Sequence, residues 1–189
     1  MSKLIPAIHD RRSDRHFTAG KPLEPDTVEA LLEAFRWAPS SGNKQPWRVL
    51  IAESAEAQRV FDDALSGGNK QWAPKAALKM VIIGVPAENP DKNGMQNYLL
   101  DAGLALQNML VQGYAMGLTI HAMAGFDAEK IRLGFALPAG ANPVAVVAAG
   151  YRGRVEDLPD EVRKKDEAPR TRKAIADIVY RDSYGNAFK

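Results

Sequence analysis

The sequence predicts a single domain that mixes α-helices with about four β-strands. Two observations predict it: apolar residues recur at offsets of three and four in several segments, and short β-branched runs bounded by proline or glycine lie between them. The chain of 189 residues is long enough for one sizeable core and crowded for two. The pattern alone leaves both an α/β and an α+β arrangement open.

Each element follows from a local pattern. Helical spacing of apolar residues predicts helices at 26–38, 54–65, 95–116 and 127–135. Runs of β-branched and other apolar residues predict strands at 47–52, 78–85, 118–122 and 144–149, with a terminal strand at 174–180. The first helix should begin at a capping box formed by Asp26 and Glu29 and end before Pro39. The helix at 95–116 is apolar around much of its girth, so we expect it at the centre of the fold or at a subunit contact.

The chain changes character after Gly150. Residues 151–173 are rich in charge and poor in large apolar side chains. This composition predicts an extended surface segment and not a second domain.

Composition excludes several classes of protein. The 25 Lys+Arg and 23 Asp+Glu leave a net charge of +2, so no overall field favours nucleic acid or an anionic membrane. The absence of cysteine excludes disulfides, thiolate metal sites and thiol catalysis, and it favours a reducing, cytoplasmic location. The first ten residues lack a signal-peptide pattern, and polar residues interrupt the apolar region 99–125, so we expect no membrane span. The three histidines are scattered, so we expect no metal site.

Three local features are suited to a ligand. Residues 11–15 (RRSDR) fit a phosphate, because guanidinium groups bind phosphate oxygens in pairs. The loop 38–47 (APSSGNKQPW) joins two prolines to hydroxyl, amide and aromatic groups, which suits a flat ligand with polar edges. In 169–173 (PRTRK), alternate residues of an extended chain share a face, so Arg170 and Arg172 can grip one anion. Taken singly, the two basic features fit solvated segments better, and the loop fits a simple connection equally well.

Five motifs occur in order along nearly the whole chain. They are R-R-S-x-R-x-F at 11–17, A-P-S-S-G-N-K-Q-P-W at 38–47, D-A-G-L-A-L-Q-N-M-L at 101–110, M-A-G-F at 123–126 and R-T-R at 170–172. In this combination the sequence resembles the nitroreductase family of FMN-dependent oxidoreductases.

The resemblance implies an α+β fold with a central mixed β-sheet flanked by helices. It also implies an interlocked homodimer with C-terminal strand exchange and an FMN in each of two interface sites. Residues 1–189 would then be a single FMN-binding domain. Within it, residues 151–189 would form an extended C-terminal segment that reaches the partner chain, and the strand at 174–180 would join the partner's sheet.

The resemblance also implies the residues of the FMN site. The contacts to phosphate and ribityl carry over to Arg11, Arg12, Ser13, Arg15, Arg170 and Arg172. The loop that the partner presents to the flavin carries over to Pro39, Ser40, Ser41 and Asn43. Asn69 matches an amide at the pyrimidine edge of the ring, and Ala124 and Gly125 match a turn whose backbone N–H points at flavin N5. Many family members have an acidic residue where this chain has Ala124, so we expect no side-chain role there. No catalytic side chain is implied, since a flavin carries the difficult chemistry itself.

By resemblance, the expected activity is transfer of hydride from NAD(P)H, through flavin N5, to an electron-poor small molecule such as a nitroaromatic or quinone, in a ping-pong cycle. Two alternatives stay open. The fold can serve another flavin reaction, such as dehydrogenation of a specialised substrate. The terminal arginines can instead belong to a non-enzymatic module that binds anions or nucleic acid, although the near-neutral charge weighs against it.

Overall fold

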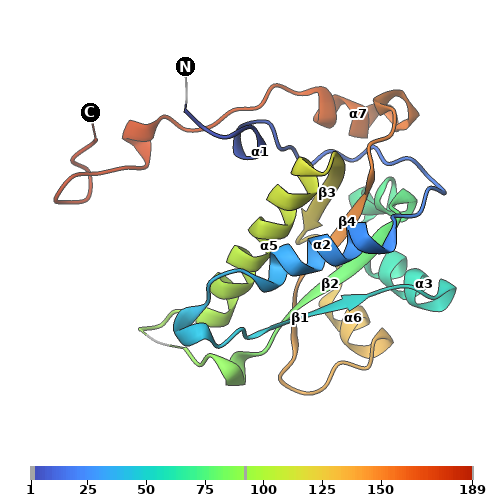
Figure 1. Ribbon diagram of the computed structural model, residues 1–189, viewed down its shortest axis with the longest axis horizontal. Helices are drawn as coiled ribbons and strands as arrows, with labels where there is room; N and C mark the ends of the chain where they lie inside the picture. Colours follow the sequence, from blue (N-terminus) through green and yellow to red (C-terminus); the bar gives the residue numbers. More distant parts are fainter. Residues whose placement is uncertain (1–2, 92, 189) are drawn as a thin grey trace.

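A four-stranded antiparallel sheet lies at the centre of the fold (Figure 1), in a computed structural model that describes residues 3–91 and 93–188. The strand order is β1-β2-β4-β3. The strands are β1 (Trp47–Ile51), β2 (Leu78–Gly84), β3 (Leu118–Met123) and β4 (Asn142–Tyr151). All four strands predicted in the first 150 residues are therefore confirmed, within a few residues at each end.

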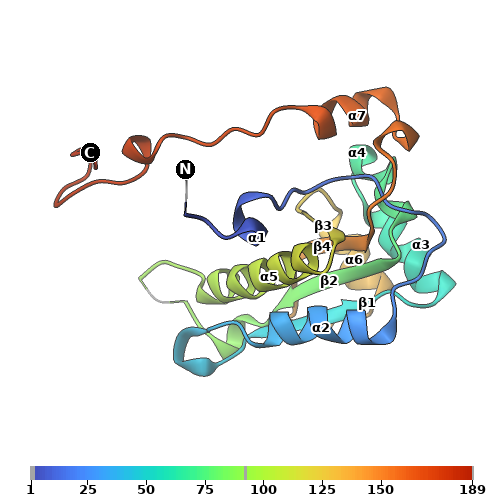
Figure 2. The same ribbon diagram turned by 45° about the horizontal axis from the view of Figure 1, so that its top comes forward.

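Helices cover both faces of this sheet (Figure 2). On one face α2 (Pro25–Arg36) and the long α5 (Asn97–Ala115) contribute to one apolar cluster, and on the other α3 (Ala55–Ala64) and α6 (Ala128–Gly134) contribute to a second. Short helices are α1 (Pro6–His9), α4 (Gly67–Lys70) and α7 (Asp160–Glu167). The 3₁₀ helices are Ser41–Asn43, Ala73–Lys75, Pro86–Glu88, Val155–Asp157 and Ile175–Asp177.

The two central strands are apolar on both faces because helices cover each side. In β2, Met80 and Ile82 belong to the cluster under α2 and α5, whereas Val81 and Ile83 belong to the cluster under α3 and α6. Alternate side chains of a strand point to opposite faces, so a continuous apolar run is what a strand buried on both faces requires. The sequence and the packing therefore agree most closely in the middle of the sheet.

The α+β fold expected from the resemblance is confirmed. The three strand pairings β1–β2, β2–β4 and β3–β4 are all antiparallel. The expected mixed character would therefore have to come from a strand that another chain supplies.

Helix starts were predicted with mixed success. Ser54 caps α3 by accepting the N–H of Ala57, and Asp127 caps α6 by accepting two backbone N–H groups. The predicted capping box at Asp26 is wrong, because α2 already begins at Pro25 and Asp26 lies inside its first turn. Proline is well suited to the first helical position, where its missing N–H would be unpaired in any case.

The charged segment 151–173 was predicted to be an extended surface segment. The prediction is wrong for part of it, because the segment contains the helix α7. Leu158 and Val162 pack into the cluster under α3 and α6, and the carboxylate of Asp166 is buried. Two apolar side chains and one paired carboxylate are enough to hold a helix whose other residues face solvent. This anchored helix brings the C-terminal part of the chain next to residues 11–15.

The residues after α7 run along the side of the molecule that carries α1 and then project away from the sheet (Figures 1 and 2). Residues 174–180 were predicted as a strand, but Ile175–Asp177 form a 3₁₀ turn, and among the described residues none of 174–180 belongs to the sheet. A strand needs a neighbouring edge to pair with, and over the described residues this arm meets no edge of the sheet, forming one isolated antiparallel bridge with itself between Tyr180 and Ala187. The side chains of Ile175 and Ile178 are consequently exposed.

Over the described residues, no helix combines the length and the apolar character needed to cross a membrane.

Candidate functional site

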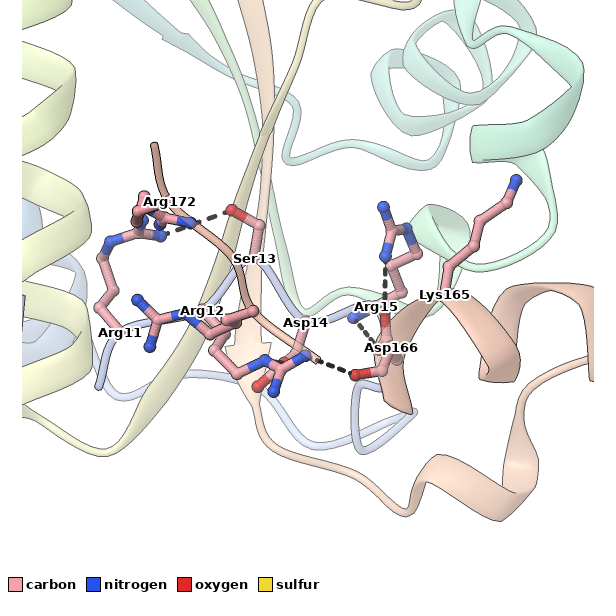
Figure 3. A pocket seen from close by; sticks show the side chains of 9 residues that line it. Arg11, Arg12, Ser13, Asp14, Arg15, Lys165, Asp166 and Arg172 are labelled. Atoms are coloured by element: carbon pink, nitrogen blue, oxygen red, sulfur yellow. Dashed lines mark hydrogen bonds and ion pairs between the residues drawn. The ribbon is translucent and has the colours of Figure 1, made fainter. Parts of the chain in front are cut away.

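A cavity of about 220 Å³ lies between the two ends of the chain (Figure 3). The segment before α2 and the segment from the end of α7 onward form its walls. Nine residues line it: Arg11, Arg12, Ser13, Asp14, Arg15, Lys165, Asp166, Arg170 and Arg172. All six residues predicted to hold the phosphate and ribityl groups therefore meet in one cavity, although they are about 155 residues apart in sequence.

Asp166 joins the two walls of this cavity. Its side chain is 1% exposed and accepts both the backbone N–H of Arg15, at 2.7 Å, and the Arg15 guanidinium, at 2.6 Å. The ring Nδ1 of His16 lies 2.9 Å from the same carboxylate. Arg12 also donates to the main-chain carbonyls of Asp166 and Ala168, at 2.7 and 3.0 Å. The N-terminal arginines are thus fixed to the C-terminal end of α7.

Asp14 compensates the positive charges of Arg12 and Arg152. Its buried carboxylate pairs with Arg152, and the Arg12 guanidinium lies 3.6 Å from it. Sequence reasoning missed both Asp14 and Asp166, as well as Lys165.

The remaining cations of the cavity are left without a carboxylate. In the part of the chain that the structure describes, neither Arg11, Arg170 nor Arg172 forms an ion pair. Burial, together with the nearby charges of Arg170 and Arg172, lowers the pKa of Arg11 below its usual range. Like charges held this close repel one another, and an anion placed between them would relieve the repulsion.

This chemistry fits the phosphate end of FMN. A phosphate monoester is a dianion with several acceptor oxygens, and arginine forks and a serine hydroxyl are the donors that bind such a group. The cavity has six basic side chains and two carboxylates. The excess of positive charge is larger than the charge of one phosphate dianion. The cavity is therefore strongly attractive to an anion even after Asp14 and Asp166 are counted.

A second group of predicted residues gathers beside α4. The side-chain amide of Asn69 donates to the carbonyl of Gly125 at 3.0 Å, and the N–H of Ser66 donates to the same carbonyl at 2.9 Å. A Cβ built on Gly125 would lie 2.8 Å from the Ser66 hydroxyl and 3.0 Å from the Asn69 amide nitrogen. A larger residue at this position would therefore have to displace Ser66 or Asn69, and Ala124, next to it, is exposed. The structure thus brings Asn69 and the 124–125 turn together.

The third predicted group, Pro39, Ser40, Ser41 and Asn43, lies elsewhere. It forms a turn after the C-terminal end of α2, whereas the arginine cavity is built from residues that precede α2 and from the C-terminal segment (Figure 1). The 12 residues of α2 extend over about 18 Å between the two. None of the four residues lines the cavity.

A buried histidine contacts the main chain of Asp14, one of the residues that line the cavity. His121 of β3 lies 4.6 Å from the ring of Trp72, and its Nδ1 is 3.2 Å from the carbonyl of Asp14. His121 is thus a buried, hydrogen-bonded histidine. No group of three or more His, Cys, Asp or Glu side chains could hold a metal ion in the described ranges 3–91 and 93–188.

These features define a class of protein: an α+β domain with an arginine-rich cavity, suited to a phosphate, between its two chain ends. The chain belongs to the nitroreductase family, since the profile described as Nitroreductase family matches residues 8–83 and relatives match over most of the chain.

Three similar proteins illustrate this membership. Protein DrgA from Synechocystis is 30% identical over 185 residues, which covers 83% of this chain and 87% of that protein. A protein from Archaeoglobus fulgidus whose name includes NADH dehydrogenase and NAD(P)H nitroreductase is 24% identical over 155 residues, which covers 80% of this chain and 86% of that protein. A crystal structure described as an oxidoreductase containing FMN matches with a TM-score of 0.86 and 28% identity, covering 97% of this chain and 95% of the other.

The environment of His121 predicts a loss of stability in acid. Burial lowers the pKa of His121 from 6.5 to about 4, so the folded state excludes a proton that the unfolded state takes up below pH 6.5. The histidine's contribution is complete above pH 6.5 and falls by roughly 2 kcal/mol between pH 6.5 and 5. Urea unfolding at several pH values should show this slope in the wild type and a shallower one in His121→Asn, which has no titrating ring. Equal slopes for the two proteins would contradict the lowered pKa of His121.

Proposed function

We propose that this protein is an FMN-dependent NAD(P)H oxidoreductase that passes hydride from the nicotinamide to an electron-poor small molecule such as a nitroaromatic or quinone. The observation that carries the proposal is the arginine cavity, in which three guanidinium groups from the two chain ends form no ion pair with any described carboxylate. Membership of the nitroreductase family supports the enzyme class, FMN as cofactor and NAD(P)H as co-substrate.

The residues of the cavity hold the phosphate and ribityl end of FMN. Arg11, Arg12, Ser13, Arg15, Arg170 and Arg172 supply the donors. Arg12 and Arg15 are already held by α7 before any ligand arrives, so little side-chain entropy is lost when they bind. The other guanidinium groups bond mainly to exposed main-chain carbonyls or to Ser13, and they can turn toward the phosphate at small cost.

The turn at Ala124 and Gly125 presents its backbone toward the reacting edge of the ring. When bound, FMN supplies the redox chemistry, accepting hydride at N5 from NAD(P)H and delivering it to the acceptor in a ping-pong cycle. Asn69 holds the Gly125 carbonyl and thereby orients the turn, and it would contact the pyrimidine edge of a bound flavin. No side-chain acid, base or nucleophile is assigned to the reaction.

The functional unit in this proposal is a homodimer with C-terminal strand exchange. Exposed apolar side chains lie on α5, just before it, and on the C-terminal arm: Met95, Leu99, Leu100, Leu104, Ile175, Ile178, Val179 and Phe188. Exposed apolar side chains that gather in this way often mark a protein–protein contact. The segment 151–189 reaches the partner, and residues 174–180 pair with the edge of the partner's sheet.

Dimerisation also accounts for the remote turn at Pro39, Ser40, Ser41 and Asn43. Since this turn is distant from the arginine cavity of its own chain, it serves the cavity of the partner, and each FMN is held by two chains.

Steady-state kinetic assays with each compound would show whether the enzyme prefers NADH or NADPH and whether it reduces nitroaromatics or quinones faster. The cytoplasmic location stays a prediction from composition.

The purified protein should be yellow and should lose its visible absorbance when NADPH or NADH is added without oxygen. Addition of a quinone or nitroaromatic should restore the absorbance and stimulate continuous oxidation of the nicotinamide. Slow reduction by both nicotinamides would favour a different flavin reaction on this fold. A colourless protein that takes up no FMN and binds DNA in a salt-dependent way would overturn the proposal in favour of an anion-binding module.

Arg172→Ala should weaken FMN binding, because one charge-assisted hydrogen bond contributes about 1.5 to 3 kcal/mol, or roughly 10- to 100-fold in affinity. The measurement is a titration of the apoprotein with FMN, followed by quenching of flavin fluorescence. Arg154→Ala is the matched control, because the side chain of Arg154 is 77% exposed and lies outside the cavity. Equal affinities for the two variants would remove Arg172 from the site.

Leu100→Asp should give a colourless monomer, because Leu100 is 52% exposed on α5 and the substitution places a charge in the proposed interface. The same change at Leu133, which is 73% exposed on α6 across the sheet, should leave a yellow dimer. Sedimentation velocity with detection at flavin wavelengths measures both properties together. A yellow monomer in the Leu100→Asp sample would show that one chain holds FMN alone.

A further inference from the structure

We propose that Asp101 is a positioning residue for FMN binding: its buried carboxylate fixes the turn at residues 40–45 in the shape that the partner's site requires. The inference rests on the proposed function, in which this turn is supplied to the second chain. It adds a residue that does not itself approach the cofactor.

The turn has an unusual backbone. Gly42, Asn43 and Gln45 have φ values of 61°, 55° and 51°, in the left-handed region that residues other than glycine rarely adopt. Such residues persist where surrounding contacts determine the conformation, and they concentrate at sites that hold ligands. The backbone strain therefore calls for an anchor outside the turn.

Bonds within the turn supply only part of that anchor. The Ser40 hydroxyl accepts the N–H of Gln45 at 3.0 Å, and the Gln45 side chain donates to Asn43 Oδ1 at 3.1 Å. Asn43 is exposed and Gln45 is only half-buried, so water competes for these bonds. They close the turn on itself but do not attach it to the rest of the molecule.

Asp101 provides the attachment. It lies in the second turn of α5 and is 2% exposed, and its Oδ1 accepts the backbone N–H of Ser41 at 3.2 Å. Its Oδ2 accepts the side-chain amide of Asn89 at 2.6 Å, and Asn89 is fully buried. One carboxylate therefore joins the turn, the segment after β2 and α5.

The carboxylate is unusual for its lack of a counter-ion. Among the described residues, no lysine, arginine or histidine forms an ion pair with Asp101. Burial of an unpaired charge is costly, and here it is compensated by two neutral N–H donors. A neutral side chain would be the cheaper choice if the position only had to fill space.

The location on α5 links the turn to the proposed interface. Leu100 and Leu104, on either side of Asp101 in the sequence, are exposed on the surface that we assign to the partner. The turn is thus hydrogen-bonded to the same helix, α5, that contacts the second chain in our proposal. A shift of the turn relative to α5 would displace it from the partner's cavity without changing that cavity.

The bonding pattern makes a specific substitution informative. Asparagine has one acceptor oxygen, so in Asp101→Asn that oxygen can still accept the Ser41 N–H only if the Asn89 amide turns over and offers its Oδ1, which is buried and has no partner among the described residues. The Asn89 N–H groups would then be buried without an acceptor, which costs more than an unpaired carbonyl oxygen. Combining Asp101→Asn with Asn89→Asp reverses the pair. The new amide then donates to the new carboxylate, and its oxygen still accepts from Ser41.

FMN titration of the three proteins tests this reading. We expect Asp101→Asn to weaken binding by about tenfold or more and the reciprocal exchange to restore most of the affinity. Wild-type affinity in Asp101→Asn, or no recovery in the exchange variant, would overturn the inference. Loss of binding in Arg172→Ala but not in Asp101→Asn would leave the proposed function standing and remove Asp101. A wild type that binds no FMN would refute the proposed function itself.

Mixed dimers separate positioning across the interface from a general loss of stability. One dimer pairs an Asp101→Asn chain with an Arg172→Ala chain, and the other pairs a wild-type chain with a chain that carries both substitutions; two affinity tags allow each to be purified. Both dimers contain the same two changes, so their effects on folding are matched. We expect one site of wild-type affinity in the first dimer and none in the second. Such a site in both dimers, or only in the second, would overturn the inference.

Discussion

The candidate site depends on the pairing of one buried carboxylate, that of Asp166, with the segment that carries Arg15. The carboxylate holds a chain end that would otherwise be a free terminal segment. It also places a negative charge among guanidinium groups, and unit charges 4 Å apart near a protein surface interact by about 4 kcal/mol. One side chain therefore both places the cations and lowers the cost of bringing them together.

The fold was predictable from sequence where one local pattern determines it. The run LKMVIIG of β2 and the apolar girth of α5 have a single reasonable interpretation, and both were confirmed. The helix α7 was missed because it is held by Leu158, Val162 and Asp166 alone, and a local pattern does not reveal what three separated residues will meet. Residues 174–180 have the composition of a strand, but strand formation depends on an available edge and not on composition alone.

The site was predictable only in part, for a related reason. The arginines stand out because they cluster at the two chain ends, and the family motifs connect them. Asp14 and Asp101 lie within the quoted motifs, but nothing in the sequence marks them or Asp166 as the carboxylates that become buried. The chain has 23 acidic residues, and only the three-dimensional structure shows which of them become buried beside a donor. Burial is a property of tertiary packing, so single-sequence reasoning finds the groups that face a ligand more readily than the groups that hold them.

The distance in sequence between the two walls of the cavity has a consequence for biosynthesis. Arg15 and Asp166 are 151 residues apart, so the cavity cannot form until α7 has emerged from the ribosome. By then all four strands of the sheet have been synthesised, and the central core can form before the cavity exists. A nascent chain therefore cannot capture its cofactor early, and a prematurely terminated chain that folds its sheet would remain empty. Under the proposed function, cofactor content thus reports synthesis through Arg172 as well as correct folding.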